Sequence, residues 1–387
     1  MKSYEELLLK LIRCAVLRND EDFSEFSDFT EWGELFALCS KHSVVGMIYD
    51  KLTEVFGSQI PEKYSFWFKQ NAFKEMSFQA VRSLSFVSIY RELLKENIAP
   101  VVLKGEVLRQ LYPQPESRTS LDEDLLIKAK EYPKLKKELS LLGFEEINEG
   151  GDDKHWVNKK YSLYFEIHFT PFTKDESYQK WNEILRGYSE RTVENKNGIV
   201  SLSREDNLIF LILHAAKHFI YSGVGIKQIL DIALFMRKYQ NDMDFSYIRS
   251  ALRKTKTLAF AEAVTAFIKK YLYSDVYCFG RKAVEEDFVT DVFGGGSLGK
   301  GDEDRVHSAN VTASAFKGQS SVKKILFPPA ERLKRNYPFC RKNPLLLPLA
   351  WLLRLISYLF GKGKKKSALK TGGRRLKLLK KYGLIKE

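Results

Sequence analysis

The feature that most constrains this 387-residue chain is a change in the spacing of its apolar residues near residue 99. Residues 1–97 carry apolar side chains at helical spacing almost throughout, and Leu7, Leu8, Leu11 and Ile12 form one such face. After Pro100 the apolar runs become short or alternating, as is typical of β-strands. Helical spacing returns from about residue 204 onward. The chain therefore combines helical and β-sheet sections, which excludes an all-helical fold.

The central section alternates expected strands with short helices. Helices are expected at residues 105–112 and 131–142, and Gly143 is a typical residue to end the second. The expected strands cover residues 100–103, 121–128, 144–147, 155–158 and 163–169. Interleaving of this kind predicts an α+β fold with a small mixed sheet, flanked by helical N- and C-terminal regions.

The same spacing and composition predict the division of the chain. The predicted sections are a helical N-terminal region (1–98), an α/β core (99–202), a helical region packed on the core (203–290), a flexible loop (291–321), a C-terminal helical segment (322–361) and a basic tail (362–387). The loop is predicted from its many glycines and polar residues, and these lack the GxxxxGK[ST] order of a phosphate-binding loop.

Positive charge is concentrated at the C-terminus. The residues after Gly361 include eleven Lys or Arg and one acid, so they hold +10 of the formal net charge of +14. Such a tail is usually solvated, although it can contact nucleic acid or an anionic membrane nonspecifically. The apolar residues 344–360 precede it; we expect them to form a helix on the N-terminal helices, with contact at a membrane surface as the alternative.

The N-terminal helix carries charges that a secretory signal would not tolerate. Glu5, Glu6, Lys10 and Arg13 interrupt its apolar residues. We therefore expect a cytoplasmic protein, peripheral to the membrane if the C-terminal segment binds lipid.

Three carboxylates in the predicted sheet suggest chemistry with metal ions. Asp122 and Asp124 stand two apart in one strand, so both side chains face the same side and can ligate one or two divalent cations. Glu166 lies in a later strand and would join them if the two strands are neighbours. Three such carboxylates are what phosphoryl transfer with two metal ions requires.

Residues suited to phosphate binding surround these acids. Gly105 follows a strand and opens a helix, so a triphosphate can approach the backbone and meet helix N–H groups. Lys104 or Arg118 can neutralise the phosphates. His168 shares the strand face of Glu166 and can line the site or lie on an ordinary sheet surface.

These residues together resemble the uncharacterised bacterial nucleotidyltransferases of the DNA polymerase β-like superfamily. The matching motifs are LKG at 103–105, RTSLDEDLLI at 118–127, EIH at 166–168, HAAKH at 214–218, DIA at 231–233 and FPP at 327–329. The resemblance implies that Asp122, Asp124 and Glu166 ligate Mg²⁺ or Mn²⁺, that Glu166 also activates the acceptor hydroxyl, and that Gly105 cradles the triphosphate. The partners it implies are an NTP and an acceptor, which could be a protein side chain, a small metabolite or an RNA end.

Two further sets of residues leave alternatives open. His214 and His218 lie one helical turn apart, where they can pack, lie beside a nucleotide, or bind metal; packing or nucleotide contact is the preferred interpretation, with Asp231 as an orienting partner. Glu106 and Glu123 depart from the superfamily pattern. A buried, unpaired Glu123 would be costly, so the alternative function is a catalytically inactive module that binds a nucleotide or a partner.

Overall fold

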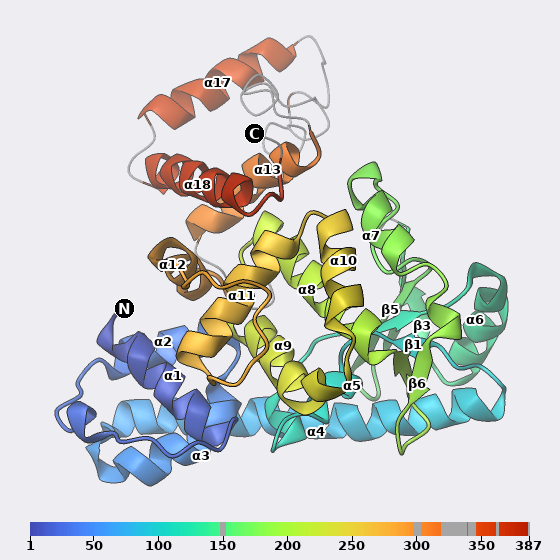
Figure 1. Ribbon diagram of the computed structural model, residues 1–387, viewed down its shortest axis with the longest axis horizontal. Coiled ribbons are helices and arrows are strands. Elements are labelled where there is room, and N and C mark those ends of the chain that lie inside the picture. The colour runs from blue at the N-terminus through green and yellow to red at the C-terminus, as the bar shows by residue number, and fades with distance from the viewer. Residues whose placement is uncertain (148–151, 297–302, 319–338, 340–345, 361–363, 386–387) are drawn as a thin grey trace.

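The computed structural model describes residues 1–147, 152–296, 303–318, 339, 346–360 and 364–385. A seven-stranded sheet lies at one side of the protein, with α4 beneath it and helices that follow it in the chain beside it (Figure 1). The predicted α+β fold, with a mixed sheet between helical regions, is confirmed.

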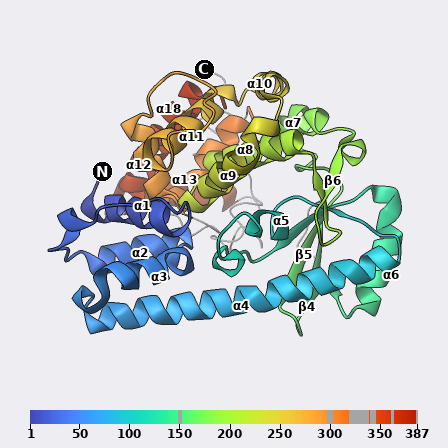
Figure 2. The ribbon, with the colours of Figure 1, turned by 60° about the horizontal axis from the view of Figure 1, so that its bottom comes forward.

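The N-terminal region is helical, as the apolar spacing predicts. Its helices are α1 (Ser3–Ala15), α2 (Trp32–His42), α3 (Val45–Phe56) and α4 (Glu62–Lys95). The 34 residues of α4 contain no glycine or proline, and the helix runs beneath both the other N-terminal helices and the sheet (Figure 2). Phe68 packs in the core of the helical part and Phe86 in the core behind the sheet. One helix thus joins the two cores.

The sheet is mixed, with strand order β3-β4-β5-β2-β1-β7-β6. The strands are β1 (Val101–Val102), β2 (Glu123–Leu126), β3 (Glu145–Ile147), β4 (Lys154–Asn158), β5 (Leu163–His168), β6 (Thr192–Glu194) and β7 (Val200–Leu202). Strands β2 and β5 are parallel neighbours, and their register places Asp124 beside Glu166. Alternate residues of β5, such as Phe165 and Ile167, are buried in the core behind the sheet.

Helices that connect the strands and follow the sheet complete the core. The connecting helices are α5 (Glu106–Arg109), α6 (Tyr132–Leu141) and α7 (Gln179–Ile184). The helices after the sheet are α8 (Arg204–Tyr221), α9 (Ile226–Tyr239), α10 (Phe245–Lys254), α11 (Leu258–Tyr271) and α12 (Glu286–Gly294). Most residues of α8 and α9 are buried, which places these two helices at the centre of the larger core.

The prediction of a flexible loop over 291–321 is wrong for much of that range. Residues up to Gly294 complete α12, and α13 (Glu303–Phe316) follows. Asp291 and Arg305 form a buried ion pair with a nitrogen–oxygen distance of 2.8 Å, which joins the two helices. Gly223 and Gly294 leave room for this guanidinium, because a Cβ at either residue would lie within 2.6 Å of it. The loop was predicted from composition, which does not reveal that Arg305 pairs with Asp291, 14 residues earlier in the chain.

The predicted basic tail is largely a docked helix. α18 (Lys364–Lys381) buries Arg375, Leu378 and Leu379, and the guanidinium of Arg375 donates hydrogen bonds to backbone carbonyls of α8. The expected solvated tail is therefore wrong for residues 371–385. The prediction considered only the charges of this segment. It missed that the leucines recur at helical spacing and can reach the core.

The apolar segment before this helix packs elsewhere than expected. α17 (Leu347–Phe360) lies against α18, at the end of the protein far from α1–α3 (Figure 1). Ala350 and Trp351 of α17 pack with Phe339. The predicted contact with the N-terminal helices is thus wrong. Across the described segments, no helix is long and apolar enough to cross a membrane. The FPP motif at 327–329 lies outside the described residues.

Candidate active site

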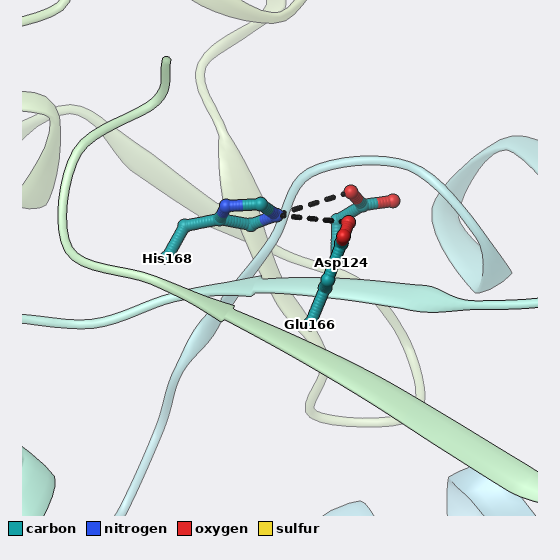
Figure 3. Close-up of side chains that lie close together, drawn as sticks. All are labelled: Asp124, Glu166 and His168. Atoms are coloured by element: carbon teal, nitrogen blue, oxygen red, sulfur yellow. Dashed lines mark hydrogen bonds and ion pairs between the residues drawn. The ribbon is translucent and has the colours of Figure 1, made fainter. Parts of the chain in front are cut away.

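Strands β2 and β5 bring two of the predicted carboxylates together with a histidine. One ligand atom each from Asp124, Glu166 and His168 lies within 4.8 Å of the other two (Figure 3). The group arises because Asp124 and Glu166 are paired in the parallel register, and His168 follows two residues later on the same face. Two carboxylates and an imidazole are donors that a divalent cation can use.

Asp122 lies just before β2, beside this group. It is half-buried and lines the same cavity as Asp124. Burial, followed by the negative charge of Asp124, raises the pKa of Asp122. A cation bound between the two aspartates would relieve that repulsion, so both residues fit a metal site.

His168 is held among three carboxylates. Its Nε2 atom lies 3.2 Å from Asp124 Oδ1 and 3.6 Å from Glu166 Oε2 (Figure 3). Its Nδ1 atom lies 3.0 Å from Asp153 Oδ1. Although burial opposes a charge on the ring, these hydrogen bonds raise the pKa of His168 well above its usual value. The neighbouring carboxylates therefore favour the protonated form of the ring. The sequence pattern did not indicate Asp153.

Lys104 contacts the same carboxylate from the other side. Its Nζ atom lies 2.9 Å from Asp124 Oδ2 and 3.0 Å from His214 Nε2. Because an ammonium only donates hydrogen bonds, Nε2 of His214 accepts one and carries no proton. Although burial opposes ionisation, Lys104 and His168 hold the pKa of Asp124 well below its usual value.

Glu123, which faces away from the cavity on β2, has a buried partner. Arg109 Nη2 lies 2.5 Å from Glu123 Oε1, and Arg109 Nε lies 3.0 Å from Glu106 Oε2. The backbone N–H of Glu106 also donates to Glu123 Oε2. Arg109 thus bonds both glutamates that depart from the superfamily pattern. Neither glutamate lines the cavity beside Asp122 and Asp124.

Gly105 has no room for a side chain, because of this same glutamate. Its φ is +51°, and a Cβ would lie 1.8 Å from Glu123 Oε2. Gly57 has a similar backbone conformation (φ +38°, ψ −110°, against ψ −118° for Gly105), but nothing lies within 4 Å of its Cβ position. A comparison of substitutions at the two glycines therefore separates the cost of backbone strain from the cost of steric conflict.

We expect Gly105→Ala to be more destabilising than Gly57→Ala. Both substitutions carry the positive-φ strain of about 1–3 kcal/mol. Gly105→Ala must in addition displace a buried, hydrogen-bonded carboxylate, which adds about 2 kcal/mol. Urea denaturation of the two variants measures this difference directly. Equal free energies of unfolding would contradict the close packing of Gly105 on Glu123.

Arg118, which the sequence analysis predicts to neutralise phosphate, is held by a buried carboxylate. It is buried, and its Nε and Nη2 atoms donate to the two oxygens of Asp231 at 2.6 and 2.8 Å. The Tyr112 hydroxyl donates to Asp231 as well. Asp231 therefore orients Arg118 rather than a histidine. One guanidinium nitrogen, Nη1, has no hydrogen-bond partner.

The histidine pair of α8 lies in the cavity wall. The rings of His214 and His218 are 4.5 Å apart and nearly perpendicular. Burial, together with the charge of Lys104, lowers the pKa of His218 to about 3, so its ring is neutral. Among the described residues, the group able to hold a metal contains His168 and neither of these two. Packing beside a ligand remains the interpretation for the pair.

The cavity has a volume of about 110 Å³ and joins residues from β2, the loop before it, α8 and α9. Its lining includes Lys104, Gly105, Arg118, Asp122, Asp124, His214, His218, Lys227 and Asp231. Seven of the predicted site residues thus share one cavity, while Glu166 and His168 adjoin it through Asp124. A larger groove of about 770 Å³ along α4 contains none of the three predicted metal-binding carboxylates.

Lys227, on α9, was missed by sequence reasoning. It is 5% exposed and lines the cavity, although it lies more than 100 residues from β2 in the chain. Burial, followed by the positive charge of Arg118, lowers the pKa of Lys227 to about 8. The only signal in the sequence that could have indicated Lys227 is its place among the apolar residues of a helix, and the structure shows that this helix is buried.

Comparison with known proteins identifies the family. Residues 28–273 match the model of a family described as uncharacterised nucleotidyltransferase, which covers α2–α4, the sheet and the helices of the cavity. No curated protein and no solved structure matches the chain. Because the match spans more than half of the chain and includes the motifs around Asp122, Asp124 and Glu166, the protein belongs to this nucleotidyltransferase family.

Proposed function

We propose that the protein transfers a nucleoside monophosphate from an NTP to a hydroxyl or phosphate acceptor, with Mg²⁺ or Mn²⁺ as cofactor. The observation that carries the proposal is the register of β2 and β5, which pairs Asp124 with Glu166 beside Asp122. Family membership supports the class of reaction. The cation, the nucleotide and the acceptor are part of the proposal.

In the proposed reaction, the chain's own residues bind and orient the reactants. Asp122, Asp124 and Glu166 would hold the cations, which stabilise negative charge on the phosphates when bound. Glu166 would accept the proton of the acceptor hydroxyl. The acceptor oxygen forms a bond to the α-phosphorus, while the bond between that phosphorus and the bridging oxygen breaks and pyrophosphate leaves. Alignment of the two oxygens supplies much of the rate enhancement.

The two glutamates that favoured an inactive module are no longer an argument for it. Arg109 bonds Glu106 and Glu123, and both lie outside the cavity lining. A triphosphate in the cavity would therefore meet neither carboxylate directly. The active interpretation is thus the better supported of the two.

The first experiment measures transfer of label from each α-phosphate-labelled NTP into total cell lysate, with Mg²⁺ and with Mn²⁺. The intact protein is compared with an Asp122→Ala/Asp124→Ala double variant, and Asp28→Ala, at an exposed N-terminal position, is the matched control. We expect label to appear with the intact protein and the control, and to be absent with the double variant. The size of the labelled product then identifies the class of acceptor.

Two results would count against the proposal. Equal labelling by the intact protein and a folded double variant would show that these carboxylates are not catalytic. The second result is a metal-dependent rise in the melting temperature with an NTP, without any transfer or pyrophosphate release. That combination would support the inactive binding module instead.

A further inference from the structure

The cavity beside the carboxylates is lined by charges of both signs. Asp122, Asp124 and Lys104 line it on the β2 side. Arg118, its partner Asp231 and Lys227 line it toward α9, where the cations outnumber the acid. The first turn of α9 also contributes Gln228 to the lining, so the positive end of that helix dipole adjoins the cavity. One end of the cavity suits cations and the other suits an anion.

Arg118, which lines this cavity, has a donor that the fold does not use. The residue is 4% exposed, and Asp231 occupies its Nε and Nη2 atoms. Its Nη1 atom is buried and has no hydrogen-bond partner. A buried guanidinium donor without a partner costs free energy, which an anionic ligand would recover.

Lys227 presents a second cation to the same space. Its Nζ atom donates to the backbone oxygen of Thr119 at 2.9 Å, the one hydrogen bond it makes within the described part of the chain. An ammonium has three N–H donors, so further donors are available to a ligand. Burial beside Arg118 disfavours its charge, as the lowered pKa indicates. An anion between the two residues would remove that penalty.

The size of the cavity restricts what can enter it. Sites that enclose a whole small molecule usually have volumes of roughly 300–1,000 Å³. A volume of about 110 Å³ admits a phosphate group or two but not a complete nucleotide. The part of an NTP that fits is therefore its phosphate end, and the base and sugar must lie outside.

We propose that Arg118 and Lys227 form a subsite for the pyrophosphate portion of the NTP, and that inorganic pyrophosphate binds there on its own. This inference rests on the proposed function for its choice of anion. Arg118 would be positioned by Asp231 and would donate through Nη1, while Lys227 would donate through its remaining N–H groups. Because neither residue reaches a base, the subsite is expected to bind the phosphates of all four NTPs alike.

Binding of inorganic pyrophosphate to the full-length protein, measured by calorimetry without divalent cations, tests the subsite. Lys227→Gln retains an amide donor for Thr119 but loses the charge, and Lys238→Met, at an exposed residue of the same helix, is the control. Loss of a charged hydrogen bond should weaken binding by about tenfold or more. We expect this loss in Lys227→Gln and Lys227→Met, and unchanged affinity in the control.

Several outcomes would overturn the subsite. Among them are no binding of pyrophosphate by the intact protein, and equal affinity of the intact protein and Lys227→Gln. Circular dichroism and melting of each variant ensure that a loss of binding is not a loss of fold. The Asp122→Ala/Asp124→Ala variant should still bind pyrophosphate, because it lacks only the acidic end of the cavity.

The subsite and the proposed function can fail independently of each other in these experiments. If pyrophosphate binding depends on Lys227 but no protein transfers label, the subsite stands and the transfer reaction fails. If label transfer depends on Asp122 and Asp124 while Lys227→Gln alters neither pyrophosphate affinity nor the KM for NTP, the subsite fails and the transfer reaction stands.

Discussion

Arg109→Met is expected to lower the free energy of unfolding by about 3–5 kcal/mol, because it leaves buried carboxylates without their cation. The Arg109 side chain is fully buried, and it bonds Glu106, Glu123 and the hydroxyl of Ser120. Methionine fills a similar volume, so the loss reports charge and hydrogen bonding rather than an empty space. Urea denaturation followed by circular dichroism measures the change.

Two further variants test this explanation. Arg91→Met makes the same substitution at an exposed position of α4 and should change stability by less than about 0.5 kcal/mol. Arg109→Met combined with Glu123→Gln removes a buried charge of each sign and should recover part of the loss. A loss below about 1 kcal/mol for Arg109→Met alone would show that Glu106 and Glu123 do not depend on it.

Asp124→Asn is expected to reduce nucleotidyl transfer by about a thousandfold, the equivalent of several kcal/mol of transition-state stabilisation. Asp124 is the carboxylate that contacts both Lys104 and His168 and faces Glu166 across the two strands. The asparagine amide has the size of the carboxylate but offers only one neutral oxygen as a ligand. Mn²⁺ binding should therefore weaken together with transfer. Initial rates of transfer and titration with Mn²⁺ measure both effects.

The control for this variant is Asp153→Asn. Asp153 contacts the other nitrogen of His168, at 3.0 Å, and is not a member of the group that could hold the cation. Its substitution should lower the pKa of His168 but reduce transfer far less than Asp124→Asn does. Equal losses in the two variants would indicate that both acids act by orienting His168, and that Asp124 does not ligate a metal.

The elements and the carboxylates that build the candidate site could be predicted because their signals are local. Alternation along β5 places Glu166 and His168 on one face, and the two-residue spacing in and before β2 relates Asp122 to Asp124. Gly105 was predicted from its place between a strand and a helix. The family motifs draw on the same short segments, which is why they identified the class of protein.

Long-range partners account for what the sequence pattern missed. The sequence presents Arg118 as a free cation, but Asp231, 113 residues later, occupies most of its guanidinium. It presents the residues after Gly361 as a charged tail, but Leu378 and Leu379 reach the main core.

By itself, then, the sequence determined the α+β architecture, the acids proposed to bind metal and the family, because side-chain period and motif spacing are properties of neighbouring residues. Only the tertiary structure decided which charges are compensated and which remain available to a ligand. It paired Arg109 with Glu106 and Glu123, and it brought Lys227 into the cavity of Asp122 and Asp124. The physical reason is that burial and electrostatic partners depend on which distant segments pack together.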